Sequence, residues 1–395
     1  MDRLKTIGLT LIGVNLALLP FSPVPKISGT AISLLGAVSL LYLFKTRNFK
    51  PKLTDAGVLL WVSAILISCL FSINPRMSFH YFDKLILKPL VLYMGIRVFT
   101  TRQDLKELCA ILGITYSAYG IAGVIYGDFS ERFRAFSPYP TILGKMLDLM
   151  IPVVASILIA SRNIVVRVTC ALGLTALITA LIASMTRGAW IATGTALSVL
   201  FAYLFFKGRY KKQLILFVAI ASLASFVLMP GYQKVILKKR LVSILHLKEE
   251  IEKDPSLAGR VRFYRTAIHL IKEKPLLGWG FGRKVVKCIN RKLSPAWFEK
   301  RGLSLIAHHT HDTYLQILLE TGIVGLFGFA VFMLSFFYES LKIIKEEKEK
   351  LLPLGLALSV LAVLIHALVT NILQAPVIYM LFAHTALVLA CNKSP

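Results

Sequence analysis

Acidic residues are scarce in this chain of 395 residues, which carries 20 Asp and Glu against 46 Lys and Arg. Long polar segments are also rare, because 56% of the residues are hydrophobic, whereas soluble domains contain about 45–50%. The five cysteines form neither a CxxC motif nor a zinc-like spacing with histidine. These absences argue against a soluble domain and against a cysteine-based metal site.

The net charge of +26 does not indicate nucleic-acid binding. Much of the positive charge lies in short clusters between apolar runs, where membrane proteins keep their cytoplasmic charge. The sequence has no basic stripe interleaved with stacking aromatic residues, which single-strand binding requires. Membrane lipids, and not nucleic acid, are therefore the expected surroundings.

Apolar runs of about 20 residues predict an all-α protein that crosses the membrane several times. The first run follows Arg3 and Lys5 like a signal peptide, but prolines replace a cleavage site, so a retained span is expected. The twelve predicted spans are 7–21, 27–44, 54–71, 84–99, 105–126, 141–160, 167–185, 188–206, 213–229, 311–338, 351–371 and 375–391.

The distribution of Lys and Arg over alternate loops predicts the topology. One set of loops holds 20 of these residues and the other, without segment 230–310, holds five. The positive-inside rule then places both termini in the cytoplasm and segment 230–310 outside, which is the periplasm if the cell is Gram-negative. The predicted organisation is nine spans in 1–229, a periplasmic loop domain at 230–310 and three spans in 311–395.

Segment 230–310 is the one long polar stretch, with 18 Lys and Arg against six acids. A helix is expected from Ser256 to about Lys274, with Val261, Tyr264, Ile268 and Ile271 on its apolar face. Its other face forms a basic stripe that serves either as a solvated surface or as a contact to anionic groups. The stripe consists of Arg262, Arg265, His269 and Lys272.

Three arginines are candidates for binding an anion. Arg187 lies between two apolar runs, where a charge is costly and often functional, although an interfacial arginine in a tight turn is the simpler alternative. Arg260 lies near the start of the loop helix, where a helix N-terminus favours anions. Arg134 is expected on the same side of the membrane and is a third, weaker candidate.

His309 and His311 lie where the loop meets the next span. Thr310 is expected to cap that helix, and its positive end would keep His311 neutral and able to act as a base. Two alternatives to a catalytic base are a structural histidine held by hydrogen bonds and a metal site made of His308, His309, His311 and Asp312. Adjacent residues of an extended segment point to opposite sides, which disfavours the metal site.

Further polar residues occur within the apparent spans. Lys145 and Asp148 are three residues apart and can meet on one helix face. A structural role is predicted for both and for Glu320, and hydrogen bonds to neighbouring helices are predicted for His366 and His384.

Several segments together resemble the O-antigen ligase/polymerase superfamily. The Arg187 turn resembles the Ser-Arg-Gly segment of that family, and 258–264 with 274–282 resembles its Gly-Arg and Pro-Leu-Leu-Gly-x-Gly loop signature. Residues 309–316 and 320–322 resemble its His-Asn-x-x-Leu and Glu-x-Gly segments. This chain differs in having Asp312 where Asn is usual and Tyr264 where Trp is common.

The resemblance implies a GT-C-like membrane fold and an inverting glycosyltransferase that needs neither a metal nor a cofactor. Such an enzyme moves a glycan from undecaprenyl diphosphate onto an acceptor, which for a ligase is the lipid A–core oligosaccharide. His311 would act as the base, and Arg187 and Arg260 would stabilise the diphosphate. His309, Arg134, Arg262 and Arg265 would bind substrate.

Three other functions compete with the ligase. A polymerase of the same superfamily would use a carrier-linked repeat as its acceptor, and the sequence separates the two poorly. A flippase would be expected to show pseudo-repeated halves, and a lipopolysaccharide-binding scaffold would form no product. The concentration of charge in one loop argues against the flippase, and a compact chain with one dominant outer loop favours the ligase over the polymerase. A monomer is expected, although the sequence leaves the oligomeric state open.

Overall fold

The computed structural model is helical throughout the residues that it describes. These are 2–21, 25–46, 49–129, 132–206, 255–305, 309–346 and 350–391, and no strand occurs among them. Eight helices in these ranges are long and apolar enough to cross a membrane. The chain is therefore a multispanning membrane protein, as the sequence predicts.

The first half of the chain forms a succession of apolar helices joined by short turns. A π-helical segment, Asp83–Leu87, continues α4 directly into α5. The helices are α1 (Asp2–Leu18), α2 (Pro25–Thr46), α3 (Leu53–Leu70), α4 (Pro75–Phe82), α5 (Lys88–Phe99) and α6 (Arg102–Tyr126).

The second half contains both apolar helices and the polar helices of the loop domain. A kink at Gly322 divides the long helix α16. The helices are α7 (Pro140–Ala160), α8 (Ile164–Ala183), α9 (Arg187–Phe206), α13 (Pro255–Glu273), α14 (Val285–Lys292), α15 (Ser294–Glu299), α16 (Thr313–Glu346), α17 (Leu351–His366) and α18 (Ala375–Ala390).

Most of the twelve expected spans correspond to helices. The break predicted around Arg187 is confirmed, because α8 ends at Ala183 and α9 begins at Arg187. Three expected spans are shorter helices than predicted, with 12 residues in α5 and 16 in each of α17 and α18. The expected span 213–229 and the first part of the loop lie outside the described residues, so the number twelve stays a prediction.

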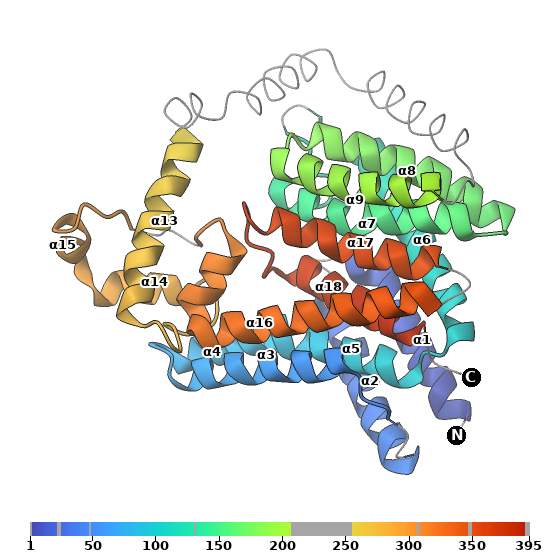
Figure 1. Cartoon of the computed structure of the whole chain (residues 1–395), viewed down its shortest axis with the longest axis horizontal. Helices are drawn as coiled ribbons and strands as arrows, with labels where there is room; N and C mark the ends of the chain where they lie inside the picture. The colour runs from blue at the N-terminus through green and yellow to red at the C-terminus, as the bar shows by residue number, and fades with distance from the viewer. Residues whose placement is uncertain are drawn as a thin grey trace.

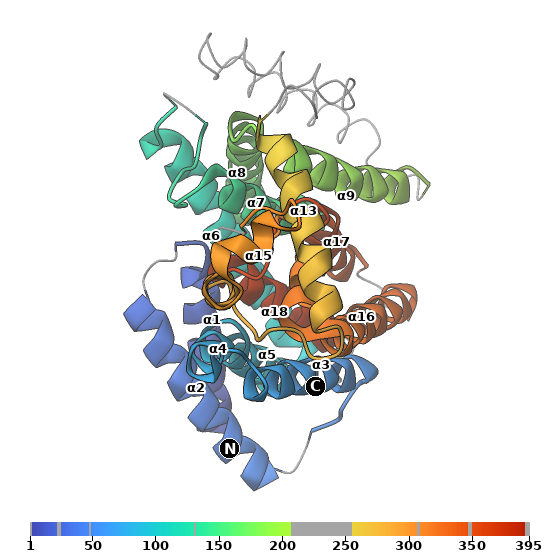
Figure 2. The ribbon, with the colours of Figure 1, turned by 90° about the vertical axis from the view of Figure 1, so that its left-hand side faces the viewer.

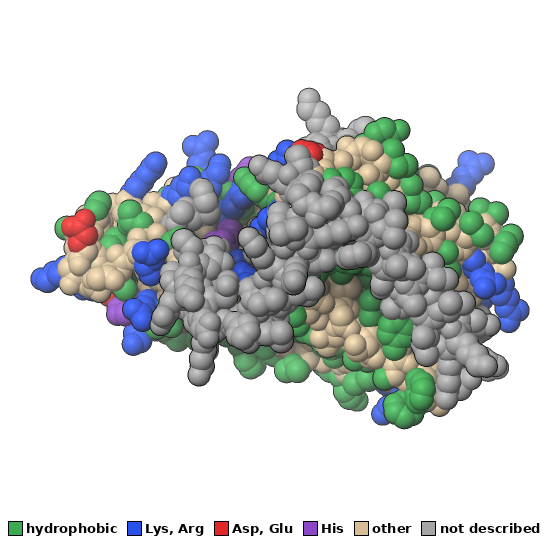
Figure 3. All heavy atoms as spheres, turned by 90° about the horizontal axis from the view of Figure 1, so that it is seen from above, with side chains coloured by type: hydrophobic (Ala, Val, Ile, Leu, Met, Phe, Trp, Pro, Cys, Tyr) green, Lys and Arg blue, Asp and Glu red, His purple; other side chains and the backbone are tan. Residues whose placement is uncertain are grey.

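The apolar helices lie side by side along the long axis of the molecule, and the loop helices α13–α15 gather at one end (Figure 1). Both termini lie towards the opposite end (Figure 1), and α13 crosses in front of the bundle in the end view (Figure 2). Seen from above, basic side chains lie towards both ends, and many of the side chains between them are hydrophobic (Figure 3). This distribution suits a bundle with polar ends and an apolar middle.

Helix α13 matches its predicted limits, but its predicted apolar face is wrong at two of four positions. Val261 and Ile268 are 36% and 44% exposed, whereas Ala267 and Leu270 are completely buried. Trp279 packs on this buried side, and its indole N–H donates to the Leu270 carbonyl at 2.8 Å. The burial of a small Ala was not evident from periodicity, because its hydrophobicity is weak beside that of Val and Ile.

Candidate active site

Four glycines dock the loop domain against α3, α4 and α16. An added Cβ would lie 2.5 Å from the Glu320 carbonyl oxygen at one of them and 2.1 Å from the Leu276 carbonyl oxygen at another. Because all four have positive φ angles, a side chain would add backbone strain to these collisions. We call this set the glycine junction: Gly278, Gly280, Gly282 and Gly322.

Hydrogen bonds connect the glycine junction to the segment that precedes α16. The backbone N–H of Gly282 donates to the Glu320 carboxylate at 2.9 Å, and the Gln316 amide donates to the same carboxylate at 2.5 Å. The side-chain oxygen Oε1 of Gln316 in turn accepts from the Thr310 backbone N–H at 2.8 Å. Glu320 is therefore buried in a network that sets the position of residues 310–312.

The backbone at His311 adopts a left-handed conformation, with φ of 62°. Asp312 rather than Thr310 caps α16, because its carboxylate accepts from the Leu315 backbone N–H at 2.8 Å. The expected Thr310 cap is thus wrong: the Thr310 hydroxyl donates to the Asp312 carbonyl at 2.7 Å. An Asn at position 312 has the same acceptor oxygen, so the Asp found here preserves the cap.

Aromatic rings surround the imidazole of His311. The ring of Phe263 from α13 stacks on it at a centroid distance of 6.0 Å, and the His309 ring lies edge-on at 4.2 Å. The Tyr264 hydroxyl donates to the His311 carbonyl at 3.4 Å. Neither ring nitrogen of His311 has a hydrogen-bond partner within the described ranges, which leaves the imidazole free to bind a substrate hydroxyl.

The surroundings of His311 keep its imidazole neutral. Burial, followed by the positive charges of Arg260 and Lys145, lowers the pKa of His311 to about 4. Arg260 lies on α13 beside Tyr264, and burial together with the nearby Asp312 raises the pKa of the Tyr264 phenol. The loop helix thus brings Arg260 to His311, and electrostatics favour the base form of the imidazole at neutral pH.

Lys145 enters this region from α7, where its side chain is 1% exposed. Its ammonium donates to the Asn371 carbonyl at 2.7 Å and to the Gln374 side chain at 2.8 Å. The same α17–α18 connection accepts a hydrogen bond from the Thr313 hydroxyl through the Thr370 carbonyl at 2.6 Å. Lys145 and the start of α16 are therefore held by one connection, residues 367–374.

A second buried contact links this connection to the Arg187 turn. His366, at the end of α17, makes a 2.6 Å contact with the Asp148 carboxylate, which also accepts from Thr193 of α9 at 2.8 Å. Gly188 packs against the His366 ring, since a Cβ there would lie 2.7 Å from it. The network thereby connects the beginning of α9 to the end of α17.

The Arg187 turn is held by the segment that precedes α7. The Arg132 guanidinium donates to the Ser184 carbonyl and the Thr186 hydroxyl, each at 3.2 Å. Met185 completes the turn with a φ of 53°. Arg187 is half-buried at the first position of α9, where a helix N-terminus supports anion binding.

A comparison of the sequence with known protein families finds a match that includes Arg187, Arg260 and His311. Residues 172–330 match a family model described as O-antigen ligase. We call residues 172–330 the family domain because they match this model. The predicted resemblance to the ligase/polymerase superfamily is confirmed.

A curated relative of the family domain is the exopolysaccharide production protein ExoQ of Rhizobium meliloti (strain 1021). The two chains are 28% identical over 98 residues, which are 25% of this chain and 22% of the relative. The match therefore spans about a fifth of that relative's length.

The family domain contains some of the predicted site residues and excludes others. Arg187, Arg260, His309 and His311 lie within it, whereas Arg134 and Lys145 precede it. The structure places Arg260, His309 and His311 together. The two arginines of α13 that were predicted to bind substrate, Arg262 and Arg265, are exposed.

Sequence reasoning did not identify Lys145 or the 367–374 connection as neighbours of the O-antigen ligase family site. A lysine within an apolar run signals function in principle, but its partners, a backbone carbonyl of Asn371 and the side chain of Gln374, carry no sequence motif. Among the described residues, no group of three His, Cys, Asp or Glu side chains is arranged to hold a metal ion. His308 lies outside those residues.

Proposed function

We propose that this chain is an inverting, metal-independent glycosyltransferase that moves O-antigen glycan from undecaprenyl diphosphate to a hydroxyl of lipid A–core oligosaccharide. The observation that carries the proposal is the position of His311, whose ring packs against α13 and whose ring nitrogens have no hydrogen-bond partner among the described residues. His311 lies in a segment that matches the O-antigen ligase family, within a multispanning membrane protein. The active site would face the periplasm from the inner membrane.

In this mechanism a free ring nitrogen of His311 accepts the proton of the acceptor hydroxyl. The hydroxyl oxygen forms a bond to the anomeric carbon of the donor glycan. The bond from that carbon to the diphosphate oxygen breaks, and the diphosphate leaves with the electron pair. The imidazolium then releases its proton to solvent, and attack opposite the leaving group inverts the anomeric centre.

Arg260 and Arg187 would stabilise the charge that develops on the leaving diphosphate. Electrostatic stabilisation of this kind is often the largest contribution to catalysis, and a guanidinium can bind a phosphate through two hydrogen bonds. Since diphosphate is a stable anion, its departure needs no general acid. The bound diphosphate would also offset the charge of Arg260 and raise the basicity of His311 during the reaction.

A polymerase that uses a carrier-linked repeat as acceptor is the second candidate. The specific observation in its favour is the name of the curated relative, which refers to exopolysaccharide production. The chemistry at His311 would be the same, because a sugar hydroxyl attacks the same type of donor in both reactions. The two candidates differ only in the acceptor.

The decisive experiment supplies the purified full-length chain with a carrier-linked glycan and either lipid A–core or a second carrier-linked repeat. Mass spectrometry would identify the product, and NMR would determine its anomeric configuration. A product on lipid A–core with inverted configuration is expected. Elongation of the carrier-linked repeat alone would favour the polymerase, and retention of configuration would overturn the single displacement.

A further inference from the structure

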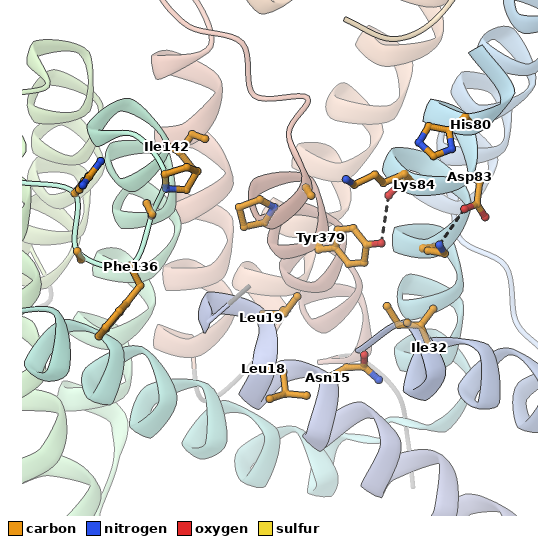
Figure 4. Close-up of a pocket in the computed structure, with 18 residues that line it drawn as sticks. Asn15, Leu18, Leu19, Ile32, His80, Asp83, Lys84, Phe136, Ile142 and Tyr379 are labelled. Carbon is orange, nitrogen blue, oxygen red and sulfur yellow. Dashed lines mark hydrogen bonds and ion pairs between the residues drawn. The ribbon is translucent and has the colours of Figure 1, made fainter. Parts of the chain in front are cut away.

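An amphipathic cavity of about 850 Å³ lies beside the candidate active site, between the ends of α1 and α2, the π-helical segment, the start of α7 and α18 (Figure 4). Its positively charged lining comes from Lys84, Lys88 and Arg134, and Asp83 supplies one carboxylate. None of the residues assigned to catalysis, Arg187, Arg260 or His311, lines it. The cavity is therefore separate from the reacting groups.

Two of its cations have no ion-pair partner in the described parts of the chain. The Lys84 side chain is exposed and points towards the interior of the cavity (Figure 4). Arg134, which also lines the cavity, is exposed and lies two residues before Phe136 in the chain. The third cation, Lys88, pairs with Asp83 at 2.9 Å. Among the described residues, Lys84 and Arg134 thus give the cavity two positive charges that no carboxylate pairs with, and these suit a doubly charged phosphate monoester.

The π-helical segment brings Asp83 and Lys84 to the cavity. Such segments are rare and are frequent at functional sites. The Tyr379 hydroxyl of α18 donates to the Lys84 carbonyl at 3.2 Å and fixes this segment beside the cavity (Figure 4). Charged residues in a membrane domain usually face a water-filled cavity or a ligand because exposure to lipid is costly.

The opposite part of the cavity is apolar. Leu18, Leu19, Ile32 and Phe136 line it, and in Figure 4 they lie below Lys84 and His80. A soluble anion would gain nothing from these side chains, whereas a hydrocarbon chain would gain about 25 cal/mol for each Å² that it buries. The combination fits a lipid with a phosphate headgroup.

The cavity is one helical turn away from residues that approach His311. Ile142 lines the cavity and precedes Lys145 by three positions on α7, while Ala375 lines it and directly follows Gln374. Lys145 and Gln374 hydrogen-bond each other at 2.8 Å. A lipid bound in the cavity would therefore carry its headgroup to the side of the candidate active site.

We propose that this cavity binds the phosphate headgroup and adjoining chain of the acceptor lipid. The assignment to the acceptor rests on the proposed function, in which both substrates are anchored in lipid and the donor diphosphate binds Arg187 and Arg260. A reaction between two lipid-anchored substrates needs two anionic sites, and the cavity supplies the second. Lys84 and Arg134 are its phosphate-binding residues.

Binding is tested with the full-length protein in micelles by native mass spectrometry, with dioctanoyl phosphatidic acid as the probe. Loss of one charge-assisted contact at Lys84→Ala is expected to weaken binding about tenfold, and Lys84→Ala/Arg134→Ala should weaken it further. Lys84→Arg should retain most of the binding, and the exposed Lys342→Ala is the matched control. Millimolar inorganic phosphate should not displace the probe.

Wild-type affinity in the double variant, or equal competition by inorganic phosphate, would overturn the lipid-phosphate site. A transfer assay then tests the assignment to the acceptor: Lys84→Ala should raise KM for the acceptor about tenfold and leave KM for the donor unchanged. A rise in the donor KM alone would assign the cavity to the donor lipid. If the wild-type protein binds the probe but forms no glycan product, the proposed function fails and the cavity site stands.

Discussion

Two polar networks lie towards opposite ends of the helical bundle and differ in whether the side chain at their centre, Asp55 in one and His311 in the other, is engaged by hydrogen bonds. Near the termini, the Asp55 carboxylate pairs with the Arg97 guanidinium at 2.7 Å and accepts from the Tyr93 hydroxyl at 2.5 Å. The backbone N–H of Lys52 adds a third contact at 2.7 Å. Both oxygens of the carboxylate are occupied by the protein itself.

The network around His311 is open by comparison. Its backbone is held by Tyr264 and His309, but the ring nitrogens of His311 have no hydrogen-bond partner among the residues that the structure describes. Arg260 is half-buried beside the ring. The hydrogen bonds of the Asp55 network stabilise the fold. The contacts around His311 fix its position and leave its ring nitrogens available to substrate.

Replacement of His311 by Ala should have the largest effect on transfer. A positioned base contributes about 10²–10⁴-fold to the rate, so His311→Ala should lower kcat by that factor. The unfolding temperature should change little, because no hydrogen bond within the described residues depends on the ring. Full activity of the purified variant, measured with carrier-linked glycan and lipid A–core, would exclude His311 as the base.

Replacement of Arg97 by Ala should have the opposite pattern. Removal of one partner from a buried ion pair costs about 3–5 kcal/mol, so Arg97→Ala should unfold at a lower temperature than the wild-type protein. Activity per folded molecule should be preserved, because the network lies away from His311. A variant with normal stability and no activity would show that the closed network takes part in catalysis.

Arg260→Ala should lower the transfer rate and also change its pH dependence. Loss of one electrostatic stabiliser costs about 10²–10³-fold in kcat. Transfer requires neutral His311, whose pKa is about 4, so kcat/KM of the wild-type protein should fall as the pH falls through 4. Because the charge of Arg260 lowers this pKa, the acid limb of the variant should move to higher pH.

The pH profiles of the wild-type protein and of Arg260→Ala are compared after each is normalised to its own maximum. Arg291→Ala on α14 is the charge-matched control. An unchanged acid limb in Arg260→Ala would contradict the electrostatic contact between Arg260 and His311. A shift of the same size in Arg291→Ala would attribute the change to the overall charge of the loop.

Tyr264→Phe should have the smallest effect. The change removes one hydrogen bond, worth about 0.5–1.5 kcal/mol, between α13 and the His311 carbonyl, and it retains the aromatic ring. We expect kcat to fall less than tenfold, with the KM of the donor unchanged. A loss as large as that of His311→Ala would indicate that the phenol itself contacts substrate.

The sequence predicted the helices of this protein more accurately than the faces that they bury. Apolar length located α8 and α9, and the capping residues and Pro275 located α13 within one residue at each end. The apolar face of α13 was wrong at two of four positions because burial there follows contact with Trp279, which periodicity cannot detect. The cap of α16 was also misplaced, because Thr310 and Asp312 are both good caps.

The amino-acid sequence by itself determined that the chain is a helical membrane protein, since an apolar run of sufficient length can satisfy its backbone in lipid only as a helix. It also determined which residue types are chemically suited to a phosphate and a sugar hydroxyl. The tertiary structure alone decided that Lys145, Arg260 and His311 are neighbours and that Lys84 and Arg134 share a cavity. Those groups come from segments far apart in the chain, and residues 367–374 and the glycine junction hold the segments that carry Lys145 and His311.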